Sequence, residues 1–147
     1  MKAYLIAAIL ALFCISASAD DGLRFVANVT SYHFSQYREY MNTDNRGLGV
    51  EYASGDMLGM IGEYRNSNKQ HSDYALAAYT PWHFGPVSIG GAIGGVNGYS
   101  GVNAGGWFPA AAGLIRAEFG KLGANLLIMP KTKDSPYTLG LQAKYAY

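Results

Sequence analysis

The stretch that decides the fold is residues 137–147, YTLGLQAKYAY. Its side chains alternate between an apolar or aromatic group and a polar or small one. The apolar and aromatic positions are Tyr137, Leu139, Leu141, Ala143, Tyr145 and Tyr147. A repeat of two residues is typical of a β-strand, whose successive side chains point to opposite faces. The stretch therefore predicts a strand with one apolar face, and its closing aromatic residues are typical of strands that face lipid.

Seven further segments with strand character precede this stretch. They are approximately residues 23–37, 46–54, 57–65, 73–81, 87–97, 107–119 and 122–130. Several have about the 9–11 residues that a tilted transmembrane strand needs. Long polar loops alternate with short turns between them, as in barrels whose short turns all lie at the periplasmic end. We therefore expect an all-β fold, an eight-stranded antiparallel transmembrane β-barrel of the outer membrane.

The composition agrees with a β-rich membrane protein. The chain has 147 residues, of which 50% are hydrophobic and 14% are charged, and its formal net charge is +1. Soluble domains usually carry about 25% charged residues. No apolar run after residue 19 reaches the roughly 20 residues of a spanning helix. These values exclude a helical membrane protein, a basic nucleic-acid binder and a disordered chain. A soluble sandwich or lipocalin-like barrel is the alternative, but it requires a polar outer face on the last strand.

The beginning of the chain predicts a secretory signal peptide. Lys2 provides a positive start, an apolar run follows, and Ala17-Ser18-Ala19 has the small residues of a cleavage site. We expect the signal peptide at 1–19, the barrel at 20–147, and a location in the cell outer membrane.

The mature chain has no motif for a metal or a cofactor. The only cysteine of the full sequence, Cys14, lies in the predicted signal peptide, which is removed from the mature chain. The glycines between residues 90 and 98 resemble a phosphate loop superficially, but no helix follows them. We therefore expect no metal, no cofactor and no disulfide.

Polar side chains gather where the strands meet the long loops. His33 lies near the end of the first strand, and Ser67 lies at the start of the second long loop. Because these two loops belong to the same rim of such a barrel, the residues can be neighbours. Histidine exchanges protons near neutral pH and serine supplies a hydroxyl. Other candidates at this rim are Ser35, Asp44, Glu63, Asn66, His71 and Asp73. A polar rim that only binds water is the alternative.

Small residues dominate several strands, at 75–78, 90–95 and 110–113. If they face inward, they leave space for an acyl chain in a barrel that side chains otherwise just fill. On the first strand, His33 shares a face with Phe25, Ala27 and Val29, which predicts an apolar lower lumen beneath the polar rim. If these residues face inward, Asn28 and Thr30 must face lipid, which counts against this assignment of the inner face.

Several segments resemble a known family in their order and spacing. They are Tyr32-His33-Phe34, Tyr40 with Asn42, GLGVE at 47–51, YRNSNK at 64–69, and the region from Phe108-Pro109 to LIMP at 127–130. Across nearly the whole mature chain they resemble the outer-membrane lipid A palmitoyltransferases of the PagP type. Members of that family move a palmitoyl chain from a glycerophospholipid to lipid A.

The resemblance implies a catalytic group at the outer rim. It implies His33 as the general base and Ser67 as a hydrogen-bonding or oxyanion-stabilising group. Asn66 stands at the position of the family's aspartate, where it can orient a histidine but supplies no negative charge. Glu63 or Asp73 is an alternative source of that charge.

The resemblance also implies how the lipid enters the barrel and what limits the length of its acyl chain. Pro109 and Pro130 correspond to the prolines of a lateral lipid gate, because proline removes a donor from the strand ladder. Ala77 or Ala78 corresponds to the glycine at the floor of the acyl pocket, where a larger residue favours a shorter chain. The implied partners are a phospholipid donor and a lipid A acceptor, with no nucleic acid, and we expect a monomer.

Two other functions fit the same pattern. A lipid A deacylase would use His33 and Ser35 with Glu51, but that family carries its His-x-Ser motif late in the chain. A small structural or adhesive barrel would explain the strands and tyrosines without any chemistry.

Overall fold

The computed structural model describes residues 21–133 and 135–147. The predicted signal peptide at 1–19 lies outside the described residues, as does Asp20.

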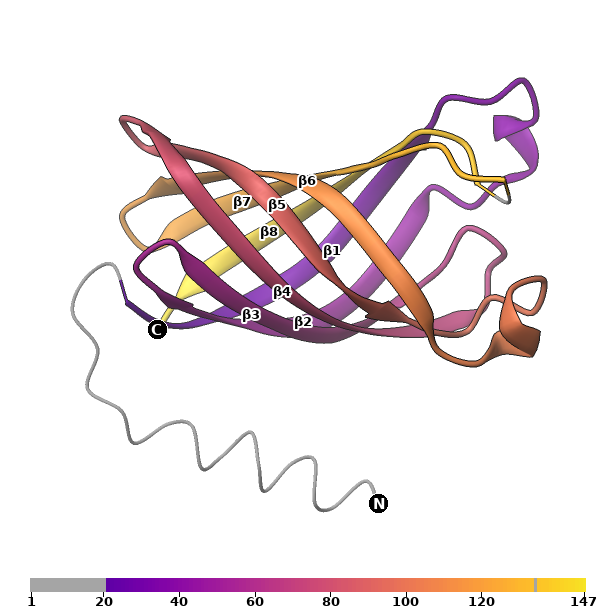
Figure 1. Cartoon of the computed structure of the whole chain (residues 1–147), viewed down its shortest axis with the longest axis horizontal. Coiled ribbons are helices and arrows are strands. Elements are labelled where there is room, and N and C mark those ends of the chain that lie inside the picture. The colour runs from indigo at the N-terminus through magenta and orange to yellow at the C-terminus, as the bar shows by residue number, and fades with distance from the viewer. Residues whose placement is uncertain (1–20, 134) are drawn as a thin grey trace, which may run out of the picture.

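Eight strands form one closed antiparallel barrel in which each strand pairs with its neighbours in the chain. The strands are β1 (Gly22–His33), β2 (Asp44–Ser54), β3 (Met57–Arg65), β4 (His71–Phe84), β5 (Val87–Val96), β6 (Phe108–Phe119), β7 (Leu122–Met129) and β8 (Thr138–Ala146). The barrel closes between β1 and β8 (Figure 1). The predicted all-β, eight-stranded antiparallel barrel is confirmed.

The two ends of the barrel differ in their connections. At the short-turn end, the turns at 55–56, 85–86 and 120–121 each begin with a glycine at positive φ, which suits tight hairpins. At the long-loop end, the loops carry the short 3-10 helices η2 (Arg38–Tyr40) and η3 (Asn103–Gly105) (Figure 1). Neither of these described helices has the length or apolarity to cross a membrane.

Two strand boundaries differ from the prediction by three residues or more. β1 ends at His33 rather than at residue 37, because the chain turns there and the Arg38 N–H donates to the Ser35 carbonyl at 3.2 Å. β4 continues past Pro81 to Phe84. The proline is tolerated because the register with β5 shifts between Tyr79 and Trp82, so no ladder donor is needed from it.

A bulge divides β1 into two halves with opposite registry. Its pairings with β2 and β8 both shift between Asn28 and Thr30. Against β8, Val29 is the extra residue, whereas on β2 Asn45 and Arg46 together lie opposite Val29. Below the bulge Val26 points inward and Phe25 is exposed, whereas above it His33 is buried. An added residue reverses which side chains face the interior. The predicted shared face of His33 and Phe25 is therefore wrong.

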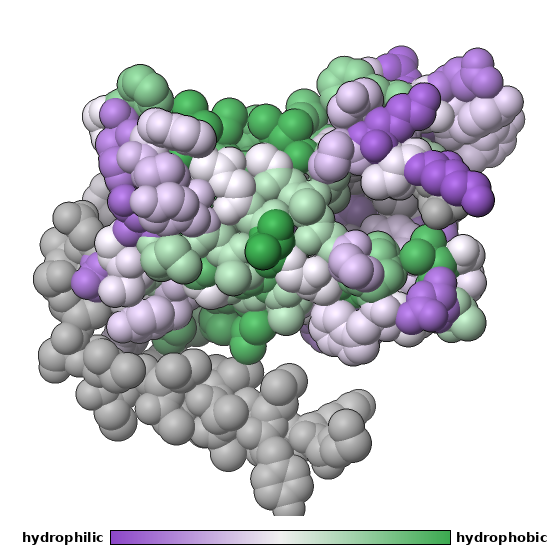
Figure 2. Space-filling view, in the orientation of Figure 1, coloured by the Kyte–Doolittle hydropathy of each residue, from purple (hydrophilic) through white to green (hydrophobic). Residues whose placement is uncertain are grey.

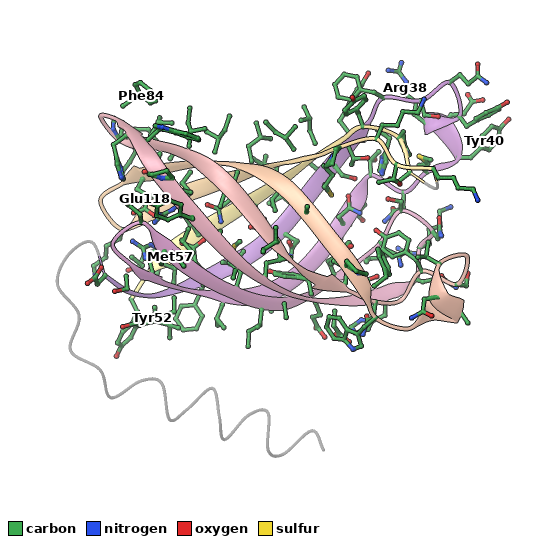
Figure 3. All side chains as sticks on the ribbon, viewed as in Figure 1. Arg38, Tyr40, Tyr52, Met57, Phe84 and Glu118 are labelled. Carbon is green, nitrogen blue, oxygen red and sulfur yellow. The ribbon has the colours of Figure 1, made fainter. Side chains whose placement is uncertain are left out.

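The outer wall is apolar in its middle, as the green band in Figure 2 shows. Exposed apolar side chains from the strands include Phe25, Val29, Leu48, Ile61, Ile93, Ile128 and Leu141. Exposed aromatic residues lie toward the ends, with Phe84 at the short-turn end and Tyr40 at the long-loop end (Figure 3). On β8 the predicted alternation is confirmed, since Tyr145 is exposed and Lys144 is buried. An apolar band with aromatic margins is typical of barrels that cross an outer membrane.

An apolar core fills the middle of the barrel. Its members are Ala53, Leu58, Met60, Tyr74, Ala78, Ala92, Leu114 and Leu127. The small residues expected to line the interior are divided between its two sides, because Ala75 and Ala77 are exposed on the outer wall. Large side chains such as Met60 and Tyr74 therefore occupy space that the sequence suggested was open.

Toward the short-turn end, the interior holds an ion cluster, which we define as Arg24, Glu51, Arg116, Glu118 and Lys144. Lys144 Nζ lies 3.0 Å from Glu51 and 2.8 Å from Glu118. Arg24 and Arg116 lie 3.0 and 2.8 Å from Glu118. The predicted apolar lower lumen is therefore wrong, because the bulge in β1 turns Arg24 rather than Phe25 inward.

Candidate active site

The structure brings together two of the predicted catalytic residues. His33 closes β1 beside Thr138 of β8, and Ser67 lies in the loop between β3 and β4. His33 Nε2 lies 2.7 Å from Ser67 Oγ. The imidazole is only 3% exposed. The pair is thus a histidine–serine dyad at the long-loop end, joined across residues distant in sequence.

The third predicted residue, Asn66, shapes the loop that carries Ser67. Its buried side chain donates to Ser72 Oγ and to the Gly98 carbonyl, both at 2.9 Å. Its Oδ1 accepts the N–H groups of Asn68 at 2.9 Å and Gln70 at 3.0 Å. Both the Nδ2 donor and the Oδ1 acceptor of Asn66 are therefore engaged by the loop and its neighbours. His33 is not among the hydrogen-bond partners of this side chain.

Asn42 holds the dyad loop from the other side. The Asn42 N–H donates to the Ser67 carbonyl at 2.8 Å, and its side-chain amide donates to the Asn66 carbonyl at 3.1 Å. The first long loop thereby fixes the backbone of the second. In the sequence, Asn42 is only one of the residues that carry the resemblance, and no local pattern indicates this role.

Among the described residues, no group partners the second ring nitrogen of His33. His33 Nδ1 is buried and makes no hydrogen bond. Ser35 Oγ instead accepts the Tyr37 N–H at 3.1 Å, and Glu51 is engaged in the ion cluster. The constellation expected for a deacylase, His33 with Ser35 and Glu51, is therefore not assembled.

The two prolines lie beside a gap in the strand ladder. Pairing between β6 and β7 ends at Gly113 and Ile128, although β6 begins at Phe108. Pro109 lies in the part of β6 that pairs with β5 but not with β7, and Pro130 directly follows β7. Beside this gap the outer wall has an apolar hollow of about 350 Å³, whose lining includes Ala111, Ile128, Pro130 and Tyr137.

The two alanines predicted at an acyl-pocket floor point in opposite directions. Ala78 is buried in the apolar core, whereas Ala77 is exposed on the outer wall. Consecutive residues of a strand cannot share a face. Only Ala78 is thus in a position to bound an internal pocket, and Leu58, Met60 and Leu114 belong to the same core cluster.

Polar side chains on the outer wall form a group that the sequence reasoning did not connect. Ligand atoms of Glu63, His71 and Asp73 lie within 4.8 Å of one another. His71 Nε2 lies 3.0 Å from Asp73 and 3.7 Å from Glu63. The register of β3 with β4 creates this group, since Glu63 pairs with Asp73 and Arg65 with His71. All three side chains are largely exposed to solvent.

No known protein family matches the chain, and comparison with curated proteins also finds no match. The resemblance to PagP-type enzymes accordingly rests on the residues themselves.

Proposed function

We propose that this chain is an outer-membrane acyltransferase that moves a fatty acyl chain from a glycerophospholipid to lipid A. The observation that carries the proposal is the contact of 2.7 Å between His33 Nε2 and Ser67 Oγ. Acyl transfer of this kind uses a general base and a hydroxyl group that lie within hydrogen-bonding distance of each other. The apolar outer wall supports a membrane location, with the long-loop end at the outer leaflet.

The dyad accounts for both halves of an ester exchange. His33 Nε2 takes the proton of the acceptor hydroxyl, whose oxygen attacks the donor ester carbonyl. Ser67 turns its hydroxyl to the oxyanion that forms. When the tetrahedral intermediate collapses, the carbon–oxygen bond to the donor breaks, and the imidazolium returns the proton to the departing lysophospholipid oxygen. Atoms and charge balance without a cofactor.

The donor's acyl chain needs an apolar surface near the dyad end. The apolar core and the ion cluster occupy the interior. We therefore do not place the acyl chain in a deep internal tunnel. The apolar hollow beside the gap between β6 and β7 is the alternative surface. Its lining of small residues, including Gly91 and Ala111, leaves room for a chain lying against the outer wall.

The filled interior also favours a second candidate, a small outer-membrane barrel without catalysis. Glu51 and Lys144 are both nearly fully buried, and they stabilise the barrel without any substrate. In this reading the His33–Ser67 contact is only a hydrogen bond that ties β1 to the second long loop.

The first experiment separates the two candidates. The chain is expressed in a bacterium without lipid A acyl-remodelling enzymes, and lipid A is analysed by mass spectrometry. Transfer adds the mass of one acyl chain, and the added mass reports the chain length. His33→Ala and Ser67→Ala should each lower the product by a factor of about 100 or more, the usual size of a lost general-base or oxyanion contribution.

His83→Ala is the matched control. His83 is exposed at the short-turn end, where its Nε2 lies 2.7 Å from Asp56. This variant should form product at the wild-type level. An unchanged lipid A spectrum from the folded wild-type barrel would contradict the acyltransferase proposal and favour the structural barrel, and a lighter lipid A would favour hydrolysis.

A further inference from the structure

The outer wall has a second hollow, on the side of β2 and β3 and next to the dyad loop. Its volume is about 280 Å³, and its lining includes Arg46, Glu63, Arg65, Lys69 and His71. We call it the basic hollow. It lies outside the barrel wall, whereas the His33 side of the dyad is buried within it. The two sites share the loop at 66–70, because Lys69 follows Ser67 by two positions.

The basic hollow is lined by three cationic side chains, Arg46, Arg65 and Lys69, and by one carboxylate, that of Glu63. Arg46 Nε is paired with Asp44 at 2.8 Å, and His71 is paired with Asp73 and Glu63. Arg65 and Lys69 are exposed and have no ion-pair partner among the described residues. Two cations at one hollow, one of them an arginine, suit an anion with several oxygens.

The hollow lies at the boundary between the apolar wall and the polar rim. On β3 the outward side chains change from Ile61 to Glu63 and then Arg65, and on β2 Leu48 lies two positions from Arg46. Each pair shares a face because strand residues alternate. A lipid beside this wall would place its acyl chains on Leu48 and Ile61 and its headgroup at the hollow. In a bilayer, phosphate groups lie at this level.

We propose that the basic hollow binds a phosphate group of a phosphorylated glycolipid in the outer leaflet, held by Arg65 and Lys69. Arg65 offers a planar pair of donors to the phosphate oxygens, and Lys69 adds a flexible point charge. This inference rests on the proposed function for one step only, the identification of the bound lipid as the lipid A acceptor. In that case phosphate binding at Lys69 brings the acceptor's sugar to the loop that carries Ser67.

The test is native mass spectrometry of the full barrel in neutral detergent, with lipid A as the probe. Dephosphorylated lipid A with the same acyl chains and inorganic phosphate are the comparison ligands. Wild-type barrel should bind lipid A about tenfold more tightly than the dephosphorylated lipid. The double variant Arg65→Gln/Lys69→Gln should lose most of this difference, as expected for two exposed charge contacts.

Lys131→Gln/Lys133→Gln is the matched control, because it removes the same charge from two exposed lysines of another long loop. It should bind lipid A like the wild type. Equal loss in both double variants would overturn the site in favour of general attraction by the rim. Equal binding of the dephosphorylated lipid, or full displacement by inorganic phosphate at a similar concentration, would overturn it as well.

The same proteins separate this inference from the proposed function. Ser67→Ala should abolish transfer yet bind lipid A normally, whereas Arg65→Gln/Lys69→Gln should raise the KM for lipid A with little change in kcat. A wild type that binds lipid A through Arg65 and Lys69 but transfers nothing would refute the acyltransferase and leave the phosphate site standing. Transfer with an unchanged KM in the double variant would refute the site alone.

Discussion

Asn66 shows at the scale of one residue how a predicted catalytic residue can have a structural role. Its amide donates to Ser72 and Gly98 and accepts from two backbone N–H groups of its own loop. A carboxylate has no donors, so it cannot make the bond to the Gly98 carbonyl, which only accepts. Asn66 is therefore suited to building the loop, and it acts on Ser67 by positioning.

Asn66→Asp tests this role directly. The buried carboxylate would face the Gly98 carbonyl and leave acceptors without donors, so the free energy of unfolding should fall by about 1–3 kcal/mol. Acyl transfer should not increase. Urea unfolding of the refolded barrel and the lipid A spectrum measure the two effects.

Asn68→Asp is the control, because Asn68 is exposed and its side chain makes no hydrogen bond shown in the loop. Its unfolding should match that of the wild type. A rise in acyl transfer in Asn66→Asp would contradict the positioning role and show that His33 lacks a negative charge.

At the scale of the element, two bulges decide which side chains reach the interior. The bulge in β1 turns His33 and Val26 to the same side although their spacing is odd. The shift in β4 accommodates Pro81 and brings the strand against Gly90 of β5. A Cβ at Gly90 would lie 1.8 Å from the Tyr79 carbonyl oxygen and 2.6 Å from Thr80 Cα. The close approach of β4 therefore requires glycine at position 90 of the neighbouring strand.

Gly90→Ala should destabilise the barrel by about 1–3 kcal/mol, because the added methyl group forces the backbones of β4 and β5 apart. Gly59→Ala is the matched control, since a Cβ at Gly59 has no atom within 4 Å. It should change stability by less than about 0.5 kcal/mol. Urea midpoints of the two variants measure the difference, and equal midpoints would show that the bulge tolerates a side chain.

At the scale of the whole molecule, the ion cluster joins strands that lie on different sides of the barrel. It includes side chains from β1, β2, β6 and β8, and Asn125 of β7 adds a hydrogen bond of 2.8 Å to Glu51. Three cations share two carboxylates, and Glu118 is the partly exposed member (Figure 3). Contacts across the lumen hold the wall in its round shape and fill the short-turn end.

Glu51→Gln should lower the free energy of unfolding by about 3–5 kcal/mol, because it leaves buried cations without their counter-charge. Adding Lys144→Met should recover part of the loss by removing one of those cations. Asp44→Asn, which breaks the exposed pair with Arg46, should cost at most about 1 kcal/mol. Urea unfolding measures all three, and a double variant less stable than Glu51→Gln would contradict this account.

The sequence predicted the barrel well because the signal is local. Alternation on β8 and glycines in the short turns report which faces are apolar and where hairpins close, without reference to distant contacts. The prediction of an apolar lower lumen failed because it, too, relied on local alternation alone. A single extra residue at Val29 reverses the faces of β1. The local sign of it in the sequence is weak: the polar Asn28 and Thr30 would both face lipid in an unbroken strand.

The amino-acid sequence by itself determined the strand number, the apolar outer wall and the pairing of His33 with Ser67 as a candidate site. The first two follow from residue periodicity and from the order of loops along the chain, whereas the choice of His33 with Ser67 among the rim residues came from the resemblance. Only the tertiary structure decided that Asn66 makes its hydrogen bonds within and beside its own loop, that charged side chains fill the short-turn end of the lumen and that Arg65 and Lys69 share a hollow. These features depend on register and on the closure of β1 against β8, which bring together side chains distant in sequence.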